Sequence, residues 1–422
     1  MSSYLCTRRG FVKTLGLAAA GLTLQSGIGP AQRHNTDKAQ RPNLLFLLAD
    51  QLGYTRCGYA GDKKARTPNI DRLASQGVNF CNAVSNTPVC AAYRASLFTG
   101  KYTTTTGMVI NELRMRMDHE CFGHVLTHSG YQTAYIGKWH LYANQLGNHD
   151  DPRNSFVPPG PHRLGFDGYW AAYNFHHNYY GAYYHTDTAK KIFYGEGVYE
   201  PDAQTDMLIE FIRKASAADR PFAAFLSYGT PHDPWAKGNV PEKYAEMFQN
   251  VPLPNPPNYK DRNDPYADSW GRLDLAQREQ LENWRRYYYA MTANLDWNIG
   301  RLTSALDQAG LADSTIVVFT SDHGEMFGAH GRKAKNIFYE EAARIPFLIR
   351  WPGKISAGSV CDACLSTVDI MPTVLALIGC KIPEDVKGVD LSHCALGRKG
   401  PEHEAAFLQN TGACAAWQDG HE

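Results

Sequence analysis

Short, almost uninterrupted runs of apolar residues alternate along the chain with longer segments of helical periodicity. Apolar runs of this length fit strands that are buried on both faces of a sheet. The clearest strand predictions are Leu44–Leu48, Thr133–Ile136, Phe222–Leu226, Ile316–Phe319 and Pro346–Ile349. Because strands and helices alternate, the pattern predicts an α/β fold with a large, mainly parallel mixed sheet sandwiched by helices.

Two helices are marked by their end signals and their periodicity. Thr67 and Pro68 have the residue types of an N-cap and a first helical position, and Gly77 ends that segment. A second apolar series recurs at helical spacing before Gly310. Its members are Met291, Leu295, Ile299, Leu302 and Leu306. We interpret this series as the core-facing side of a long helix rather than as a cofactor site.

Polar residues that can bind metal or transfer protons follow four of the predicted strands. They are Asp50-Gln51, Lys138-Trp139-His140, Thr230-Pro231-His232 and Asp322-His323. The carboxyl ends of parallel strands meet at one edge of an open sheet, and ligands bind there. Four separate clusters are therefore expected to form one site. Its oxygen donors and its histidine suit a hard divalent cation.

Residues 88–101 carry the strongest candidate chemistry. Cys90 opens a run of good helix formers after a turn, so its sulfur is expected at a helix N-terminus, which favours an anion. Arg94 lies four residues further on and projects from the same helical face. A potential nucleophile beside a fixed positive charge suits a tetrahedral oxyanion such as sulfate or phosphate. A cysteine and an arginine alone would more often be ordinary buried residues.

The longer motif around Cys90 resembles the signature of the formylglycine-dependent sulfatases, Cys-x-Pro/Ala-x-Arg followed by Leu-x-Thr-Gly-Arg/Lys. The matching residues are Cys90, Ala92, Arg94, Leu97, Thr99, Gly100 and Lys101. The resemblance implies an alkaline phosphatase-like fold and hydrolysis of sulfate esters of carbohydrates or aryl compounds. It also implies that a formylglycine-generating maturation enzyme modifies Cys90, and that the hydrated, metal-bound aldehyde attacks sulfur. Ala92 in place of the commoner proline is more typical of radical-type, oxygen-independent maturation.

Two further segments, 48–51 and 320–325, resemble the metal-binding segments of this family. The implied metal ligands are Asp50, Gln51, Cys90, Asp322 and His323. Calcium is the metal that the resemblance implies, with Mg²⁺ or Mn²⁺ as alternatives. Gln51 and His323 are variants of the commoner aspartate and asparagine at these two positions.

The remaining motif matches imply roles for individual side chains. A Gly-Lys-Trp-His segment implies that Lys138 and His140 steady the hydrated aldehyde, and that His140 helps to expel sulfate. A Pro-His-x-Pro segment implies that His232 protonates the leaving group. Lys335 corresponds to the family's sulfate-binding lysine, since its spacing to the following Tyr-Glu pair favours it over Lys333.

The net charge bears on the classes of binding partner that can be expected, and the N-terminal segment bears on the location of the protein. Lys plus Arg and Asp plus Glu each number 42, so net charge gives no reason to expect nucleic acid or an anionic membrane. Residues 1–31 contain Arg8-Arg9, an apolar run over 15–24 and small residues before a possible cleavage site. This order predicts a twin-arginine signal peptide, a twin-arginine translocase as partner, and a periplasmic or secreted protein. No segment reaches transmembrane length.

We expect three parts along the chain. Residues 1–31 form the signal peptide, 42–395 the sulfatase catalytic domain, and 396–422 the start of an incomplete C-terminal subdomain. Sulfatases usually continue with an antiparallel sheet packed on a helix, and the run ending at Leu408 resembles the first strand of that sheet. If nothing else covers that face, apolar surface is expected to be exposed.

Two groups of residues leave alternatives open. The chain has 10 cysteines, and Cys361-x-x-Cys364 has the spacing of redox and zinc motifs. Without a second Cys/His pair at metal-site spacing, we favour structural thiols or a local disulfide. The aromatic loops over 166–200 can either stack on sugar rings or pack as ordinary core. The histidines of this region, which we expect to be exposed or stacking, are His162, His176, His177 and His185.

Two other functions fit parts of the sequence. Phosphonate monoester and phosphodiester hydrolases of the same superfamily use the same formylglycine site and carry Asp-Gln and Asp-His pairs. A non-catalytic protein that binds sulfated glycans would keep the anion site without turnover. The full set of catalytic motifs favours the sulfuric ester hydrolase.

Overall fold

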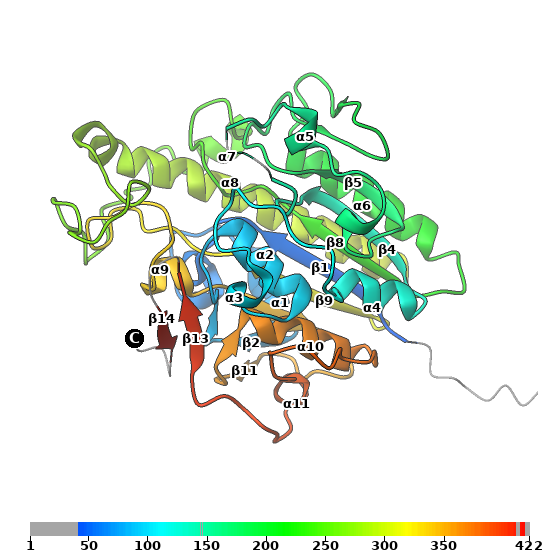
Figure 1. The fold of residues 1–422 in the computed structure, drawn as a ribbon. Helices are drawn as coiled ribbons and strands as arrows, with labels where there is room; N and C mark the ends of the chain where they lie inside the picture. The colour runs from blue at the N-terminus through cyan, green and yellow to red at the C-terminus, as the bar shows by residue number, and fades with distance from the viewer. Residues whose placement is uncertain (1–40, 144, 146, 411–413, 418–422) are drawn as a thin grey trace, which may run out of the picture. The chain divides into compact units, whose positions relative to one another are not determined.

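A mixed sheet forms the centre of the computed structural model, which describes residues 41–143, 145, 147–410 and 414–417 (Figure 1). In spatial order its strands are β11 (Ser359–Cys361), β2 (Val78–Phe80), β10 (Phe347–Arg350), β9 (Thr315–Ser321), β1 (Asn43–Ala49), β8 (Phe222–Ser227), β4 (Gln132–Lys138) and β5 (Tyr169–Tyr173). All five predicted strands are confirmed. The predicted signal peptide, residues 1–31, lies outside the described residues.

The strands around β1 are parallel, as predicted. β1 pairs with β8 and β9, and β8 continues through β4 to β5, all in the same direction. Phe46 of β1 lies in register between Phe225 of β8 and Val318 of β9. β10 runs antiparallel to both of its neighbours, which makes the sheet mixed. The carboxyl ends of five strands therefore share one edge.

Within the described part of the chain, three two-stranded sheets accompany the large one. They pair β3 (Ala83–Val84) with β12 (Leu365–Ser366), β6 (Tyr183–Tyr184) with β7 (Ile192–Phe193), and β13 (Ala406–Gln409) with β14 (Cys414–Trp417). β13 contains the strand expected near Leu408. Leu408 is buried in a small cluster with Val84 and Ala343, so β13 packs against the main body.

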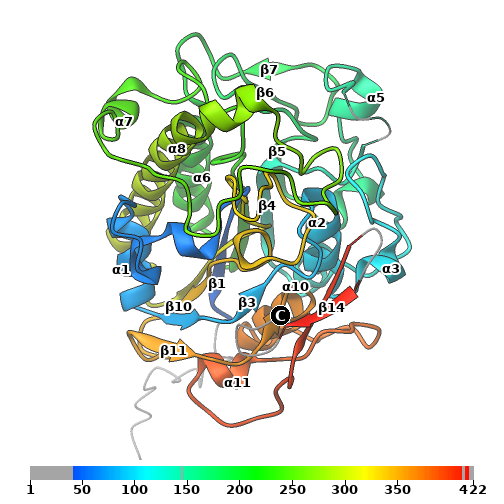
Figure 2. The same ribbon diagram turned by 90° about the vertical axis from the view of Figure 1, so that its left-hand side faces the viewer.

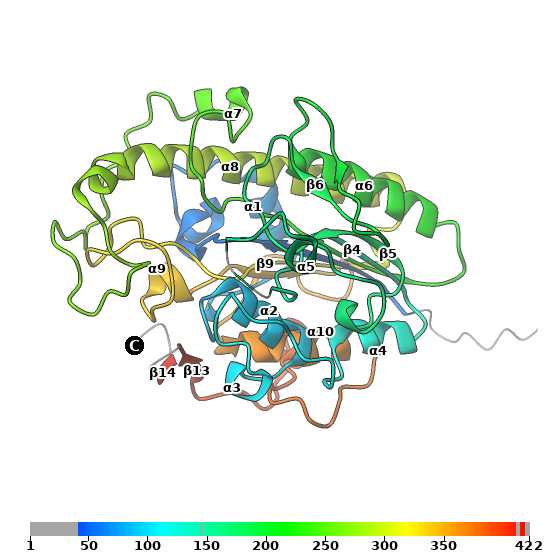
Figure 3. The same cartoon turned by 45° about the horizontal axis from the view of Figure 1, so that its top comes forward.

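Helices cover both faces of the large sheet (Figures 2 and 3). On one face lie α1 (Pro68–Ser75), α6 (Glu200–Ala215) and α8 (Leu275–Gln308), and on the other lie α2 (Cys90–Thr99), α4 (Phe122–His128) and α10 (Thr367–Leu377). Shorter helices are α3 (Thr103–Thr106), α5 (Pro152–Ser155), α7 (Glu242–Glu246), α9 (Glu340–Ala343), α11 (Ser392–Ala395), η1 (Tyr54–Arg56), η2 (Gly58–Ala60) and η3 (Pro161–Arg163). No helix in the described ranges is both long and apolar enough to cross a membrane.

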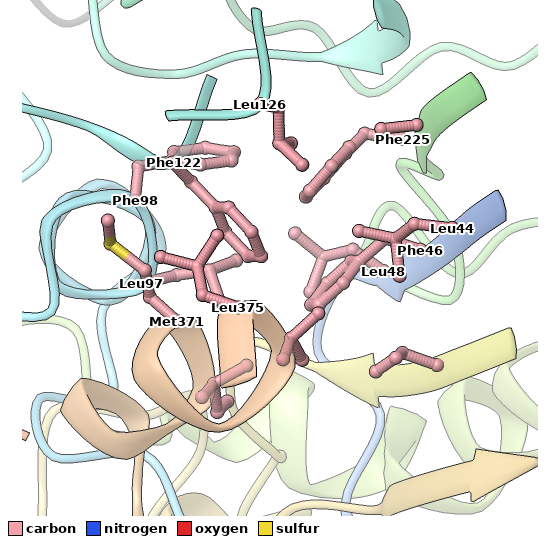
Figure 4. Close-up of a cluster of buried hydrophobic side chains, with 14 of the residues drawn as sticks. Leu44, Phe46, Leu48, Leu97, Phe98, Phe122, Leu126, Phe225, Met371 and Leu375 are labelled. Carbon is pink, nitrogen blue, oxygen red and sulfur yellow. The ribbon is translucent and has the colours of Figure 1, made fainter. Parts of the chain in front are cut away.

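Alternate residues of β1 build the two cores. Leu45 and Leu47 face α1, α6 and α8, where the predicted apolar series of α8 is buried. Leu44, Phe46 and Leu48 face α2, α4 and α10 (Figure 4). Successive side chains of a strand point to opposite faces, so one apolar run supplies both cores.

The start of α1 is capped differently from the sequence expectation. Thr67 occupies the N-cap position, but its hydroxyl donates to Asp71 and accepts from the Gly58 backbone N–H. The free N–H groups of Asn69 and Ile70 instead donate to Asp296, at 2.9 and 2.8 Å. Asp296 belongs to α8, so a tertiary contact replaces the local cap.

Candidate active site

The four predicted polar clusters meet at the carboxyl edge of the sheet. Asp50 follows β1, Lys138 ends β4, His232 follows β8 and Asp322 follows β9. A cavity of about 720 Å³ opens over this edge. Its lining includes Cys90, Lys138, His140, His232 and Lys335. The structure therefore brings together residues that are far apart in the sequence.

Cys90 is the first residue of α2, as expected from the sequence, and it is buried. Its sulfur lies 3.1 Å from His323 Nε2 and 3.9 Å from Asp50 Oδ1. Burial and the nearby Asp50 carboxylate raise the pKa of the Cys90 thiol to about 11. An unmodified thiol would therefore be protonated at neutral pH and would be a weak nucleophile.

Arg94 shares the helix face of Cys90 but does not line the cavity. Its guanidinium is fully buried and donates to Asp50 at 3.2 Å and to Asp322 at 3.3 Å. It also donates to the Lys138 carbonyl and the Ser227 hydroxyl, both at 2.7 Å. Arg94 thus joins α2 to the ends of four strands and holds two carboxylates in position.

Four of the five predicted metal ligands form one cluster. Donor atoms of Asp50, Cys90, Asp322 and His323 all lie within 4.8 Å of one another. His323 Nδ1 lies 3.0 Å from the Gly324 carbonyl oxygen, which can only accept, so Nδ1 carries the ring proton. The lone pair of Nε2 therefore faces the cluster. Two carboxylates and a directed imidazole are a donor set that fits a divalent cation.

Asp50 is ionised in this environment. Burial alone would raise its pKa, but the positive charges of Lys138 and Arg94 outweigh burial and hold the pKa well below the usual value. The Lys138 ammonium is 2.6 Å from Asp50 Oδ2. The side chain of Gln51, the fifth predicted ligand, is hydrogen-bonded to Lys335 and Glu325.

The Gln51 side chain connects Lys335 to Glu325. Its oxygen accepts from Lys335 Nζ at 2.6 Å, and its nitrogen donates to Glu325 Oε2 at 2.7 Å. Lys335 Nζ also lies 2.8 Å from His232 Nε2. A lysine ammonium can only donate, so His232 accepts at Nε2 and carries its proton on Nδ1, 3.0 Å from the Asp233 carbonyl. Lys333, the competing lysine, lines the same cavity but is half-buried.

His140 faces the cavity with both ring nitrogens unpartnered within the described structure. The residue is buried, and its backbone adopts a left-handed conformation with φ of 55°. Its ring stacks on Phe175 at a centroid distance of 4.7 Å. Burial and the Lys138 charge lower the pKa of His140 well below the usual value, so the imidazole is neutral. The ring nitrogens of His140 are therefore available to a group bound in the cavity.

Trp139 lies between Lys138 and His140 in sequence and points to the opposite side, into the core. Its indole stacks on Phe98 of α2 at 5.4 Å. It also meets Trp170 of β5 edge-on at 5.1 Å. The helix that carries Cys90 and the strand that carries Lys138 are therefore packed against one aromatic cluster.

His177 is an active-site residue that the sequence analysis did not select. Its ring stacks on His232 at 4.1 Å, and its Nε2 lies 3.3 Å from Lys138 Nζ. It follows β5, so it obeys the rule that located the other clusters. The same rule could have located His177 from the sequence, but β5 lies in a segment that we interpreted as loops.

The other histidines of that region have structural roles. His176 is buried, stacks on Tyr173 at 3.7 Å and lies 2.6 Å from Glu200. His185 is also buried and meets the Tyr183 ring edge-on, so both histidines take the aromatic-contact role of the two expected roles rather than the exposed one. His162 packs edge-on against Tyr142. Most aromatic residues of 166–200 likewise belong to the core, and the cavity walls are Phe175, Trp235, Trp270 and Trp284.

Comparisons with known proteins agree with this geometry. A family model described as Sulfatase matches residues 42–380. An ulvan-active sulfatase of Formosa agariphila is 39% identical over 373 residues, covering 87% of this chain and 67% of the relative. An N-acetylglucosamine-6-O-sulfatase of Bacteroides thetaiotaomicron is 29% identical over 444 residues, covering 90% and 74%. A solved structure concerned with metabolism of multiple glycosaminoglycans by Bacteroides thetaiotaomicron is similar with a TM-score of 0.77 at 27% identity, covering 88% and 80%.

Proposed function

The chain belongs to the sulfatase family and is a sulfuric ester hydrolase, and we propose that it acts on sulfated glycans with Cys90, converted to formylglycine, as the reacting residue. The observation that carries the proposal is the convergence of Cys90 with Asp50, Asp322 and His323 at the floor of the cavity. Relatives named for ulvan and for N-acetylglucosamine 6-O-sulfate support a glycan substrate. The aromatic walls of the cavity offer faces on which sugar rings can stack.

The charge balance of the site supports a bound cation. Three buried carboxylates (Asp50, Asp322, Glu325) balance three buried cations (Arg94, Lys138, Lys335). A monoanionic sulfate ester therefore needs additional positive charge. A divalent ion, for which we favour Ca²⁺ because carboxylate oxygens predominate, would supply that charge when held by Asp50, Asp322 and His323. Formylglycine, once hydrated, would supply a hydroxyl that attacks sulfur and a second hydroxyl that allows sulfate to leave.

The side chains around the cavity then divide the remaining tasks. Lys138 and Lys335 are placed to bind the oxygens of the sulfate group. The Lys335 ammonium faces His232 Nε2, so this pair can pass a proton to the oxygen of the leaving group. His140 is neutral, and its unpartnered nitrogens can take the proton from a hydroxyl at position 90.

The test combines peptide mass spectrometry with a sulfate-release assay. The protein is produced with a formylglycine-generating enzyme, and conversion of Cys90 is measured before activity. We expect release of sulfate from aryl sulfates and sulfated oligosaccharides at rates above those for phosphonate monoesters and phosphodiesters, and none from a matched Cys90→Ala variant. Full conversion with glycan binding but no turnover would indicate a binding protein. Faster phosphonate or phosphodiester hydrolysis would assign the alternative activity.

We further propose that the protein is exported through the twin-arginine translocase. Arg8-Arg9 followed by an apolar run supports this location. Fusion of residues 1–40 to a reporter should give export that Arg8→Lys with Arg9→Lys abolishes. Export that survives the double substitution would contradict the proposal.

A further inference from the structure

Donor atoms of the kind that bind soft metal ions meet near the edge strand β11, away from the active-site cavity. Among the residues that the structure describes, His393, Cys394 and Glu402 each bring one donor atom to within 4.8 Å of the other two. His393 and Cys394 belong to α11, and Glu402 lies in the segment that follows. None of the three lines the cavity that contains Cys90.

The separations between these atoms are close to those around a tetrahedral metal ion. Cys394 Sγ lies 3.2 Å from His393 Nε2 and 3.4 Å from Glu402 Oε1. His393 Nε2 and Glu402 Oε1 are 4.0 Å apart. With Zn–S near 2.3 Å and Zn–N near 2.0 Å, neighbouring ligands of tetrahedral zinc are separated by about 3.3 to 3.8 Å. The observed distances bracket this range.

Cys361 adds a second sulfur to the group. It is the last residue of β11 and belongs to the buried cluster against which Cys394 packs, and each of the two thiols affects the pKa of the other. The Glu402 carboxylate acts electrostatically on both sulfurs. Cys364 instead lies in a separate buried cluster, so the structure pairs Cys361 with α11 rather than within the Cys-x-x-Cys motif.

The segments that carry the donors are held close together. A Cβ atom at Gly400 would lie 2.4 Å from the His393 ring, so only glycine lets the chain pass this closely. The Arg398 backbone N–H donates to the His393 carbonyl at 2.8 Å. On the other side, the Cys81 N–H donates to the Cys361 carbonyl at 2.9 Å, which ties this donor to the sheet.

We propose that Cys361, His393, Cys394 and Glu402 form a structural zinc site that fastens α11 and the following segment to the edge strand β11. His393, Cys394 and Glu402 already lie close enough to share one ion, and a movement of the Cys361 thiol toward them would complete the four-coordinate shell that Zn²⁺ favours. Four protein ligands leave no open position for a substrate, so the site contributes to stability and not to ester hydrolysis. The competing state is a disulfide between Cys361 and Cys394, which would remove both sulfur donors.

Cobalt substitution tests the proposal in the full-length chain. A Cys90→Ser background ensures that no active-site thiol contributes, and a non-thiol reductant keeps the other cysteines reduced. We expect one equivalent of Co²⁺ to produce a thiolate-to-cobalt charge-transfer band that Zn²⁺ abolishes. Either Cys361→Ser or Cys394→Ser should reduce the band to about half, because one of the two thiolates is lost.

Two further variants separate metal binding from folding. Cys364→Ser, a matched change in the same motif, should retain the full band. Glu402→Gln changes a partly exposed side chain, should fold normally, and should keep the band while weakening zinc affinity by about tenfold or more. The proposal is overturned if the reduced protein gives no thiolate-to-cobalt band, or if the band survives both cysteine changes. It is also overturned if non-reducing mass spectrometry finds a disulfide between Cys361 and Cys394 in the purified protein.

Discussion

At the scale of single residues, His177 contacts two active-site groups at once. Its ring stacks on His232, and its Nε2 accepts a hydrogen bond from the Lys138 ammonium at 3.3 Å. A hydrogen bond to a charged group is worth about 1.5 to 3 kcal/mol. We therefore expect His177→Ala to lower kcat/KM for an aryl sulfate by about ten- to a hundredfold in steady-state assays.

The matched control for this change is His162→Ala. His162 packs on Tyr142 and does not line the cavity, so its loss should leave kcat/KM near the wild-type value. If His177→Ala is as active as His162→Ala, His177 has no role in positioning Lys138 or His232.

Arg94 allows charge and geometry to be tested separately. Arg94→Met leaves the Asp50 and Asp322 carboxylates buried without their partner, and we expect it to lower the free energy of unfolding by about 3 to 5 kcal/mol. Arg94→Lys keeps the charge but cannot span four acceptors, so it should cost less stability and still abolish activity. Denaturant unfolding in metal-free buffer measures the stability of both variants, and the sulfate-release assay measures their activity. Equal destabilisation by the two variants would contradict this division.

The sequence predicted most of this site because its chemistry follows strand ends. Asp50 and Asp322 come directly after recognisable strands, and Lys138 ends one. His232 lies in the loop that follows β8. Side-chain direction was not predictable in the same way. Gln51 turns to Lys335, and Arg94 lies behind the cavity wall, because contacts from other elements orient them.

At the scale of elements, α8 holds the start of α1 through Asp296. Its carboxylate accepts from the backbone N–H groups of Asn69 and Ile70, yet burial raises its pKa to about 6. The folded-state pKa therefore exceeds the unfolded value of about 3.9, so protonation favours the folded state. This contribution is complete below about pH 4 and is lost as the pH rises through about 6.

Asp296→Asn keeps an oxygen acceptor but cannot titrate. Between about pH 4.5 and pH 7 its free energy of unfolding should rise relative to the wild type by about 1 to 2 kcal/mol. Denaturant unfolding of both proteins at the two pH values measures how much the free energy of unfolding of each protein changes with pH. The difference between these two changes reports on Asp296, because the other titrating groups contribute equally to both proteins. If the two free energies change equally with pH, Asp296 does not titrate in this range.

The length and composition of each strand determined whether the apolar pattern of the sequence predicted it. The strands of six or seven residues (β1, β4, β8 and β9) gave clear apolar runs, and the predicted alkaline phosphatase-like fold is confirmed. β5 was missed because its residues, Tyr169–Tyr173, open an aromatic segment that we interpreted as loops. β2 and β11 have three residues each, too few for a pattern, and their pairing depends on the completed sheet.

At the scale of the whole molecule, the donor atoms of Asp50, Cys90, Asp322 and His323 bring together elements that are distant in the chain. Ca²⁺ added to metal-free protein should raise Tm by several degrees, because a ligand at a hundred times its Kd stabilises by about 2.7 kcal/mol. Differential scanning fluorimetry with and without Ca²⁺ measures the shift. Asp322→Asn should abolish it, and a shift of equal size in this variant would place calcium elsewhere.

The aromatic packing beneath the site determines where this enzyme can change. Phe98 and Trp139 bind the helix of Cys90 to the strand of Lys138, so a substitution there would misalign the reacting groups whatever the substrate. Trp270, in contrast, reaches the cavity from a loop that carries none of the reacting groups. That loop can be exchanged while the chemistry beneath it stays fixed. Evolution and engineering can therefore change which sulfate ester the protein accepts by rebuilding this part of the rim.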